Sequence, residues 1–202
     1  MKKILLIGLA LALLLGYLYF RSFTSGPKYA LLQAKEAAQN HNMAEFEKYV
    51  DVESLTNSLV DQITGSPGLT ENFIPGLRLS KSVIDLFKPT LARAARAEVK
   101  NYVETGRINT RLEGNEMLFS LAAIIGTIVS DDSQFKSIAY VKENGGEALV
   151  GLEFTQPKFD TTVVVEIKML DKGDYYQATD FTNAGELLQH LINMQNKQAA
   201  NR

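Results

Sequence analysis

The chain contains no cysteine. It therefore forms no disulfide, and it has no thiolate nucleophile, no cysteine-ligated metal and no lipidated cysteine. Histidine is nearly as scarce, because His41 and His190 are the two present in 202 residues. Histidine is the side chain most often used as a general base, so the sequence offers little material for a histidine-based active site.

Several motifs of common enzyme classes are absent from the sequence as well. It has no phosphate-cradling glycine loop, no Gly-x-Ser-x-Gly elbow and no metal-ligand spacing. His41 precedes Glu45 and Glu47, but helical spacing puts these acids on a solvent face, whereas His41 falls in a turn. We expect His190 on a helix surface. We therefore predict no catalytic residue, no metal, no cofactor and no enzymatic activity; a hydrolase or isomerase using Asp or Tyr is the least favoured alternative.

An uncharged run of seventeen residues, 4–20, follows Lys2 and Lys3 and precedes Arg21. As a helix it is about 26 Å long at ~1.5 Å per residue. This length is just enough for a bilayer core of about 30 Å when the flanking charged side chains reach the headgroups. Residues 1–21 are therefore predicted to form a transmembrane signal anchor.

Cleavage of this segment as a signal peptide is the competing interpretation. Thr24 and Gly26 have the spacing of a cleavage site, but Pro27 would follow the cut, which is a poor context for the peptidase. We expect the anchor to be retained in the inner (cytoplasmic) membrane as a single pass. The two N-terminal lysines then stay in the cytoplasm, and residues 22–202 form one domain on the periplasmic or extracellular side.

The first half of that domain has helical periodicity. Apolar residues at helical spacing predict helices over residues 27–39, 43–50, 53–63 and 81–105. Residues 64–80 hold three glycines and two prolines and predict a loop, either a cover over a cavity or a docked segment. The apolar stretch 117–129 is too short for a second membrane span and predicts a buried helix.

The second half alternates between apolar and polar residues. Four strand-like runs are separated by short turns, which predicts antiparallel strands over residues 135–143, 147–154, 161–170 and 175–181. A last helix over residues 184–197 follows. The order of elements predicts an α+β fold, in which a helical layer packs on a curved, cone-like four-stranded meander. It is similar to the nuclear-transport-factor-like cone folds, and such a shape leaves a mostly apolar pocket between its layers.

A basic stripe lies along the predicted helix 81–105. Residues 78–111 contain eight basic and three acidic residues, a net charge of +5, whereas the whole chain has −2. The stripe has two interpretations: a solvated helix face with ordinary ion pairs such as Lys100 with Glu104, or contact with anionic lipid headgroups at about 1 kcal/mol per basic residue. The total charge argues against nucleic acid as a partner. The candidate residues for contact with an anionic surface are Arg93, Arg96, Lys100 and Arg107.

The stretch GPKYALLQAKEAAQNHNMAEFEKYVDVESL, residues 26–55, resembles the start of the bacterial domain-of-unknown-function family numbered twenty-nine thirty-nine. In that family a hydrophobic segment precedes a Pro-Tyr-containing helix, a polar turn, and a short helix ending in Tyr-Val-Asp. The resemblance implies a membrane-anchored bacterial protein without an assigned activity. The matching residues in this chain are Pro27, Tyr29, Ala37, Phe46, Tyr49, Val50, Asp51 and Leu55.

These features together predict a membrane-anchored extracytoplasmic binding domain, with the membrane as a partner through the N-terminal helix. The expected ligand is lipid-like or another small apolar molecule, because apolar layers lie close to a bilayer. An interaction or scaffold module of the cell envelope is the alternative, with the basic stripe or a sheet edge meeting an unidentified protein partner.

Overall fold

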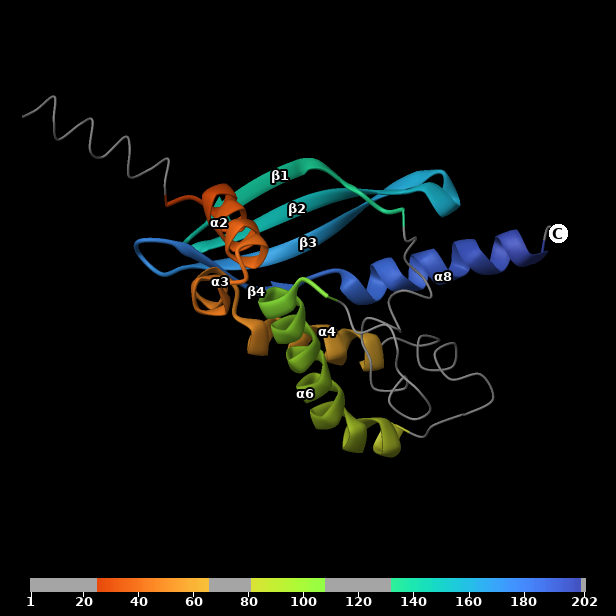
Figure 1. The fold of residues 1–202 in the computed structure, drawn as a ribbon. Helices are drawn as coiled ribbons and strands as arrows, with labels where there is room; N and C mark the ends of the chain where they lie inside the picture. The colour runs from red at the N-terminus through yellow and green to blue at the C-terminus, as the bar shows by residue number, and fades with distance from the viewer. Residues whose placement is uncertain (1–24, 66–80, 108–131, 201–202) are drawn as a thin grey trace, which may run out of the picture.

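The computed structural model describes residues 25–65, 81–107 and 132–200. These residues form an α+β fold with five α-helices and one four-stranded antiparallel sheet (Figure 1). The helices are α2 (Pro27–Gln39), α3 (Met43–Tyr49), α4 (Val52–Gly65), α6 (Lys81–Thr105) and α8 (Ala184–Ala200). The strands are β1 (Phe135–Asn144), β2 (Glu147–Gln156), β3 (Thr161–Asp171) and β4 (Tyr176–Phe181), with a short 3-10 turn, η2 (Pro157–Phe159), after β2.

The sheet is a meander with the order β1-β2-β3-β4, as the alternating pattern predicts. Ala148 pairs with Met169 and Val150 with Ile167 across β2 and β3. Alternate side chains point to opposite faces of a sheet, so these four residues share one face. All four are buried.

The helices cover this apolar face of the sheet (Figure 1). Helix α2 approaches closely because it contributes the small side chains Ala30 and Ala34. Val150 and Met169 are fully buried in this cluster, at 0% exposure. We call it the sheet cluster; its members are Ala30, Ala34, Tyr49, Leu55, Ala148, Val150, Ile167, Met169, Tyr176 and Ala178. A second cluster joins the helices to the other end of β3 and comprises Ile63, Ala95, Phe159, Val163, Leu188, Leu191 and Ile192.

The opposite face of the sheet carries polar side chains that pair across strands. The ring of Tyr140 on β1 lies against Gly151 on β2, where an added Cβ would be 2.6 Å from the ring. The Tyr140 hydroxyl donates to Glu166 on β3, and the Lys142 ammonium lies 4.6 Å from the centre of the Tyr140 ring. Burial, together with the bond to the Glu166 carboxylate, raises the pKa of Tyr140 to about 12. This hydroxyl therefore stays protonated at neutral pH.

Helix α6 forms an outer layer, packed on α4, α2 and α3 (Figure 1). It continues through Pro89, and it buries Ala92, Ala95 and Val103. Its C-terminal end is attached to the turn between α2 and α3. There the Nδ1 of His41 donates to the Val103 carbonyl at 2.9 Å, which fixes the proton on Nδ1 because a carbonyl can only accept.

His41 lies in the predicted turn, and it has a positive φ of 56°. The hydrogen bond to the Val103 carbonyl gives His41 a structural role, because it attaches this turn to α6. The sequence alone does not reveal this contact.

The predicted elements agree closely with the observed ones, apart from the last helix, which continues to Ala200. Three predicted segments lie outside the described residues. They are the anchor (residues 1–21), most of the loop (residues 66–80) and the buried helix (residues 117–129). Among the helices that the structure describes, none has the length and apolar character needed to cross a bilayer.

Candidate functional site

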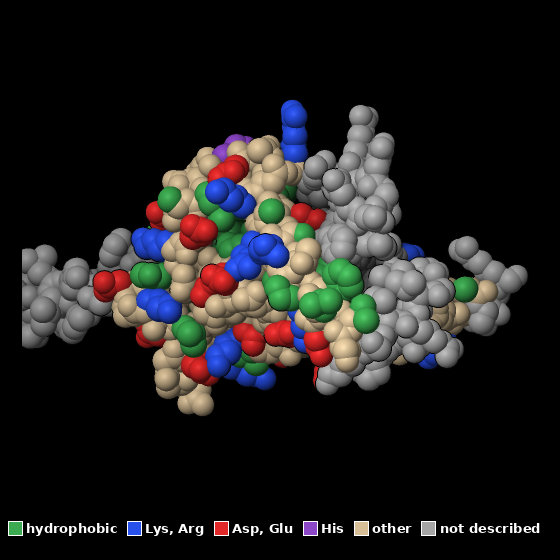
Figure 2. All heavy atoms as spheres, turned by 90° about the horizontal axis from the view of Figure 1, so that it is seen from below, with side chains coloured by type: hydrophobic (Ala, Val, Ile, Leu, Met, Phe, Trp, Pro, Cys, Tyr) green, Lys and Arg blue, Asp and Glu red, His purple; other side chains and the backbone are tan. Residues whose placement is uncertain are grey.

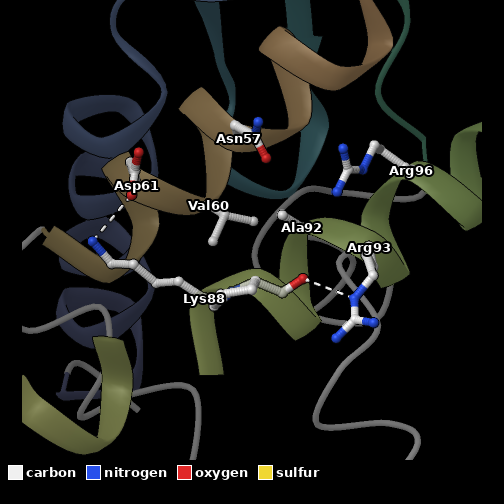
Figure 3. Close-up of a pocket in the computed structure, with 8 residues that line it drawn as sticks. Asn57, Val60, Asp61, Lys88, Ala92, Arg93 and Arg96 are labelled. Carbon is white, nitrogen blue, oxygen red and sulfur yellow. Dashed lines mark hydrogen bonds and ion pairs between the residues drawn. The ribbon is translucent and has the colours of Figure 1, made fainter. Parts of the chain in front are cut away.

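A cavity of about 470 Å³ lies between α4 and α6 (Figure 3). The sequence predicts an apolar pocket between the helices and the sheet. The observed cavity lies instead between two helices, on the side of α4 that meets α6. The physical reason is that side chains of the sheet cluster, Met169 among them, fill the helix–sheet interface. The residues around the cavity are Asn57, Val60, Asp61, Lys88, Pro89, Ala92, Arg93 and Arg96.

Helical spacing brings these side chains together. On α4, Asn57 and Asp61 are four residues apart; on α6, Lys88, Ala92 and Arg96 are at successive intervals of four. Residues at this spacing lie on one face of a helix, so the two faces meet across the cavity. Val60 and Ala92 are 3% and 5% exposed and form an apolar floor, whereas Pro89 is exposed at its edge. The floor is hollow because its side chains are short.

Two ion pairs connect α4 to α6 at either end of the cavity. Lys88 Nζ lies 3.0 Å from an Asp61 carboxylate oxygen, and Arg96 Nη1 lies 2.5 Å from Glu53 Oε1. The side-chain hydrogen bond to Asp61 is the largest of the effects that raise the pKa of Lys88. We call the Lys88–Asp61 and Arg96–Glu53 ion pairs the bracketing pairs.

Arg93 lies between the bracketing pairs along the sequence of α6, and its Nε donates to the Pro89 carbonyl of the same helix at 3.4 Å (Figure 3). Within the described residues Arg93 has no carboxylate partner. Asn57 faces the cavity from α4, the opposite helix, and its amide can donate hydrogen bonds.

The charges around the site balance. Lys88 also lies 3.5 Å from an Asp85 carboxylate oxygen on its own helix. Lys88, Arg93 and Arg96 contribute three positive charges, and Asp61, Asp85 and Glu53 contribute three negative ones.

The structure divides the four basic residues that the sequence singles out. Arg93 and Arg96 both line the cavity. Lys100 instead pairs with Glu104 at 3.7 Å on the helix surface, which is the predicted i, i+4 contact. Arg107 lies beyond the end of α6, where its backbone carbonyl accepts a hydrogen bond from Asn101. Figure 2, seen from the α6 side, shows Lys and Arg side chains interspersed with Asp and Glu.

Sequence reasoning missed Asn57, Asp61 and Lys88. Their importance depends on which face of α4 meets α6, and no local pattern in the sequence carries that information. Lys88 has one clue in the sequence, because it begins the series Lys88, Ala92 and Arg96 at intervals of four.

The other residues considered for chemistry lie away from the cavity. His190 is exposed on α8, as predicted. Across residues 25–65, 81–107 and 132–200, no three His, Asp or Glu side chains are grouped so that they could hold a metal ion.

Comparison with known proteins gives no relative: no family model, no curated protein and no solved structure matches this chain. The resemblance of residues 26–55 to the bacterial family of unknown function thus stays a prediction. The chemistry of the cavity is the basis for a functional proposal.

Proposed function

We propose that this protein is a membrane-anchored extracytoplasmic binding domain that holds a lipid-like ligand in the cavity between α4 and α6. The observation that carries the proposal is the combination of an apolar floor with basic side chains at its edge. Val60 and Ala92 form the floor, and Arg93 and Arg96 lie among the charged side chains around it. An amphiphile with an acidic head group complements both parts.

The two parts of the cavity supply different contributions to binding. Apolar ligand surface that leaves water on the floor contributes about 25 cal/mol per Å². An arginine adds charge-assisted hydrogen bonds in a planar geometry that matches the oxygens of a phosphate or carboxylate. Binding requires no reacting group, which is consistent with the non-catalytic role predicted from the sequence.

The sequence supports a position close to the bilayer. Helix α2 begins at Pro27, so residues 22–26 are the whole connection to the predicted anchor. Five residues span at most about 18 Å when fully extended. The proposed anchor would hold the domain within reach of lipid headgroups, at the inner membrane and on its outer side.

Native mass spectrometry of the full chain, released from neutral detergent micelles, tests this proposal. We expect a reproducible adduct on the wild-type protein, identified as an acidic lipid after extraction. Ala92→Phe should remove the adduct by filling the floor. The matched control is Ala97→Phe, the same substitution at an exposed position of the same helix, which should retain it.

Two results would contradict the proposal. An adduct that persists equally in both variants would place the ligand elsewhere. A bare protein mass for the wild type would favour the alternative, an interaction module of the cell envelope, and crosslinking would then be used to find its protein partner.

A further inference from the structure

Helix α6 is held in place unequally along its length. In its C-terminal part Ala92, Ala95 and Val103 are at most 5% exposed. In its N-terminal part none of residues 82–90 is buried, and Leu86 is 75% exposed. Buried apolar contacts supply most of the free energy that holds a helix on its neighbours, so the N-terminal part is the easier one to displace.

Pro89 lies at the boundary between these two parts. The helix continues through Pro89, but proline has no backbone N–H. The Asp85 carbonyl, four residues earlier, therefore lacks the hydrogen bond that a regular helix would provide. Helices bend at such interruptions. Because Pro89 also lines the cavity, a bend at this residue changes the width of the cavity.

The two ends of the cavity differ in a related way. Arg96, in the C-terminal part of α6, pairs with Glu53 of α4 at 2.5 Å. Lys88, in the N-terminal part, lies 3.0 Å from Asp61 of α4 (Figure 3) and 3.5 Å from Asp85 of its own helix. Lys88 can therefore leave Asp61 and keep a carboxylate partner, whereas the described residues give Arg96 no second carboxylate.

We propose that α6 bends at Pro89, its hinge, and widens the cavity at the Lys88 end when a ligand binds. Residues 81–88 swing away from α4, and Lys88 exchanges Asp61 for Asp85. The opposite end of the cavity keeps its bracketing pair. This inference rests on the proposed function and adds how the same cavity admits its ligand.

Spin labels measure the bend directly, because the chain has no cysteine of its own. Leu32→Cys on α2 and Leu86→Cys on α6 place labels at positions that are 57% and 75% exposed. Tyr102→Cys, at 48% exposure, replaces Leu86→Cys in the control pair. In full-length protein in neutral detergent, saturating dioctanoyl phosphatidylglycerol should shift the 32–86 distance measured by pulsed electron paramagnetic resonance. The 32–102 distance should stay unchanged.

Pro89→Ala tests the hinge itself. Alanine restores the missing backbone donor and stabilises the straight helix. The affinity for dioctanoyl phosphatidylglycerol should therefore fall by about five- to tenfold, the factor that one hydrogen bond predicts. Thr90→Ala is the matched control at the exposed neighbouring position, where the backbone N–H is already present. It should change the affinity by no more than about twofold.

Asp85→Asn and Asp61→Asn remove the same charge near Lys88 but should act in opposite directions. Without the Asp85 carboxylate, Lys88 has no partner in the widened state, so binding should weaken by up to about fivefold. Without the Asp61 carboxylate, no pair has to break, so binding should strengthen by up to about fivefold. Tighter binding in both variants would show a response to charge alone and would overturn the exchange of partners.

The outcomes separate the hinge from the proposed function. Lipid binding that is lost in Ala92→Phe, but that leaves the 32–86 distance unchanged and is unaffected by Pro89→Ala, would overturn the hinge and keep the cavity as the ligand site. Failure of the lipid to bind the wild type would contradict the proposed function. The ligand-free distances then decide the hinge: a broad 32–86 distribution that narrows in Pro89→Ala supports it, and equally narrow distributions in both proteins overturn it.

Discussion

The helix–sheet interface and the α4–α6 interface of this molecule are built from different side chains. In the sheet cluster, large apolar residues such as Met169 and Tyr49 fill the space beneath the small residues of α2. Between α4 and α6 the floor residues Val60 and Ala92 are short, and the rim is closed by ion pairs. The buried side chains of the first interface pack against one another, whereas the second contains a cavity.

This difference separates stability from function. Burial of apolar surface contributes most of the folding free energy, whereas partly exposed ion pairs contribute about 0–1 kcal/mol each. The charged side chains around the α4–α6 cavity are therefore weak contributors to stability, so selection for binding can act on them at little cost to the fold. The predictions below test this separation in order of decreasing effect.

Met169→Ala should give the largest loss of stability. Met169 is 0% exposed within the sheet cluster, and truncating such a side chain typically lowers the free energy of unfolding by about 2–5 kcal/mol. Denaturant unfolding of the full chain measures the change. Leu32→Ala is the control, since Leu32 is 57% exposed and its truncation should change the free energy by less than about 0.5 kcal/mol. Equal effects from the two variants would refute the assignment of the core.

Adding atoms should distinguish packed regions from the cavity. A methyl group at Gly151 would lie 2.6 Å from the Tyr140 ring, so Gly151→Ala should cost about 1–3 kcal/mol. Ala92→Leu places its new atoms into the cavity and should change stability by less than about 1 kcal/mol. Thermal unfolding measured on both variants makes the comparison. A larger loss for Ala92→Leu would mean that the cavity does not accommodate added atoms.

His41→Ala should weaken the attachment of the C-terminal end of α6. It removes the 2.9 Å hydrogen bond to the Val103 carbonyl, which typically stabilises by about 0.5–1.5 kcal/mol. Hydrogen exchange of the amides near Val103 should accelerate, while ligand binding in the cavity should persist. Loss of binding with unchanged exchange would instead give His41 a direct role in the site.

Asp61→Asn should have the smallest effect, about 0–1 kcal/mol, because it breaks one partly exposed ion pair. The folded state holds the Lys88 proton more tightly than the unfolded chain does, since its pKa is raised. This stabilisation is therefore complete below the ordinary lysine value of 10.5 and is lost as the pH rises through the raised pKa. Unfolding curves at pH 7 and pH 11 should show the difference between wild type and variant shrinking. A difference that grows with pH would contradict the pairing.

Local patterns in the sequence were sufficient to predict the helices and strands of the described residues. The alternation of Val163, Val165, Ile167 and Met169 predicts β3, and short turns between strands fix the meander. No local pattern in the sequence predicted the contacts between segments that are far apart in the chain. Glu53 and Arg96 are forty-three positions apart in the sequence, and His41 and Val103 are sixty-two apart.

The candidate site was predicted in part for the same reason. A helical repeat of basic residues identified Arg93 and Arg96, because their spacing lies within one helix. That repeat did not separate them from Lys100 and Arg107, since the separation depends on where α4 crosses α6. The acidic members of the bracketing pairs come from α4 and were therefore missed.

The most direct test of the cavity as the ligand site is a map of backbone amide shifts in the full chain, held in neutral micelles and titrated with dioctanoyl phosphatidylglycerol. We predict that the largest saturable shifts cluster on both sides of the cavity, at Asn57 and Val60 on α4 and at Ala92 and Arg93 on α6. Shifts concentrated on the outer face of the sheet or on α8, with these four amides unchanged, would contradict a ligand site between α4 and α6.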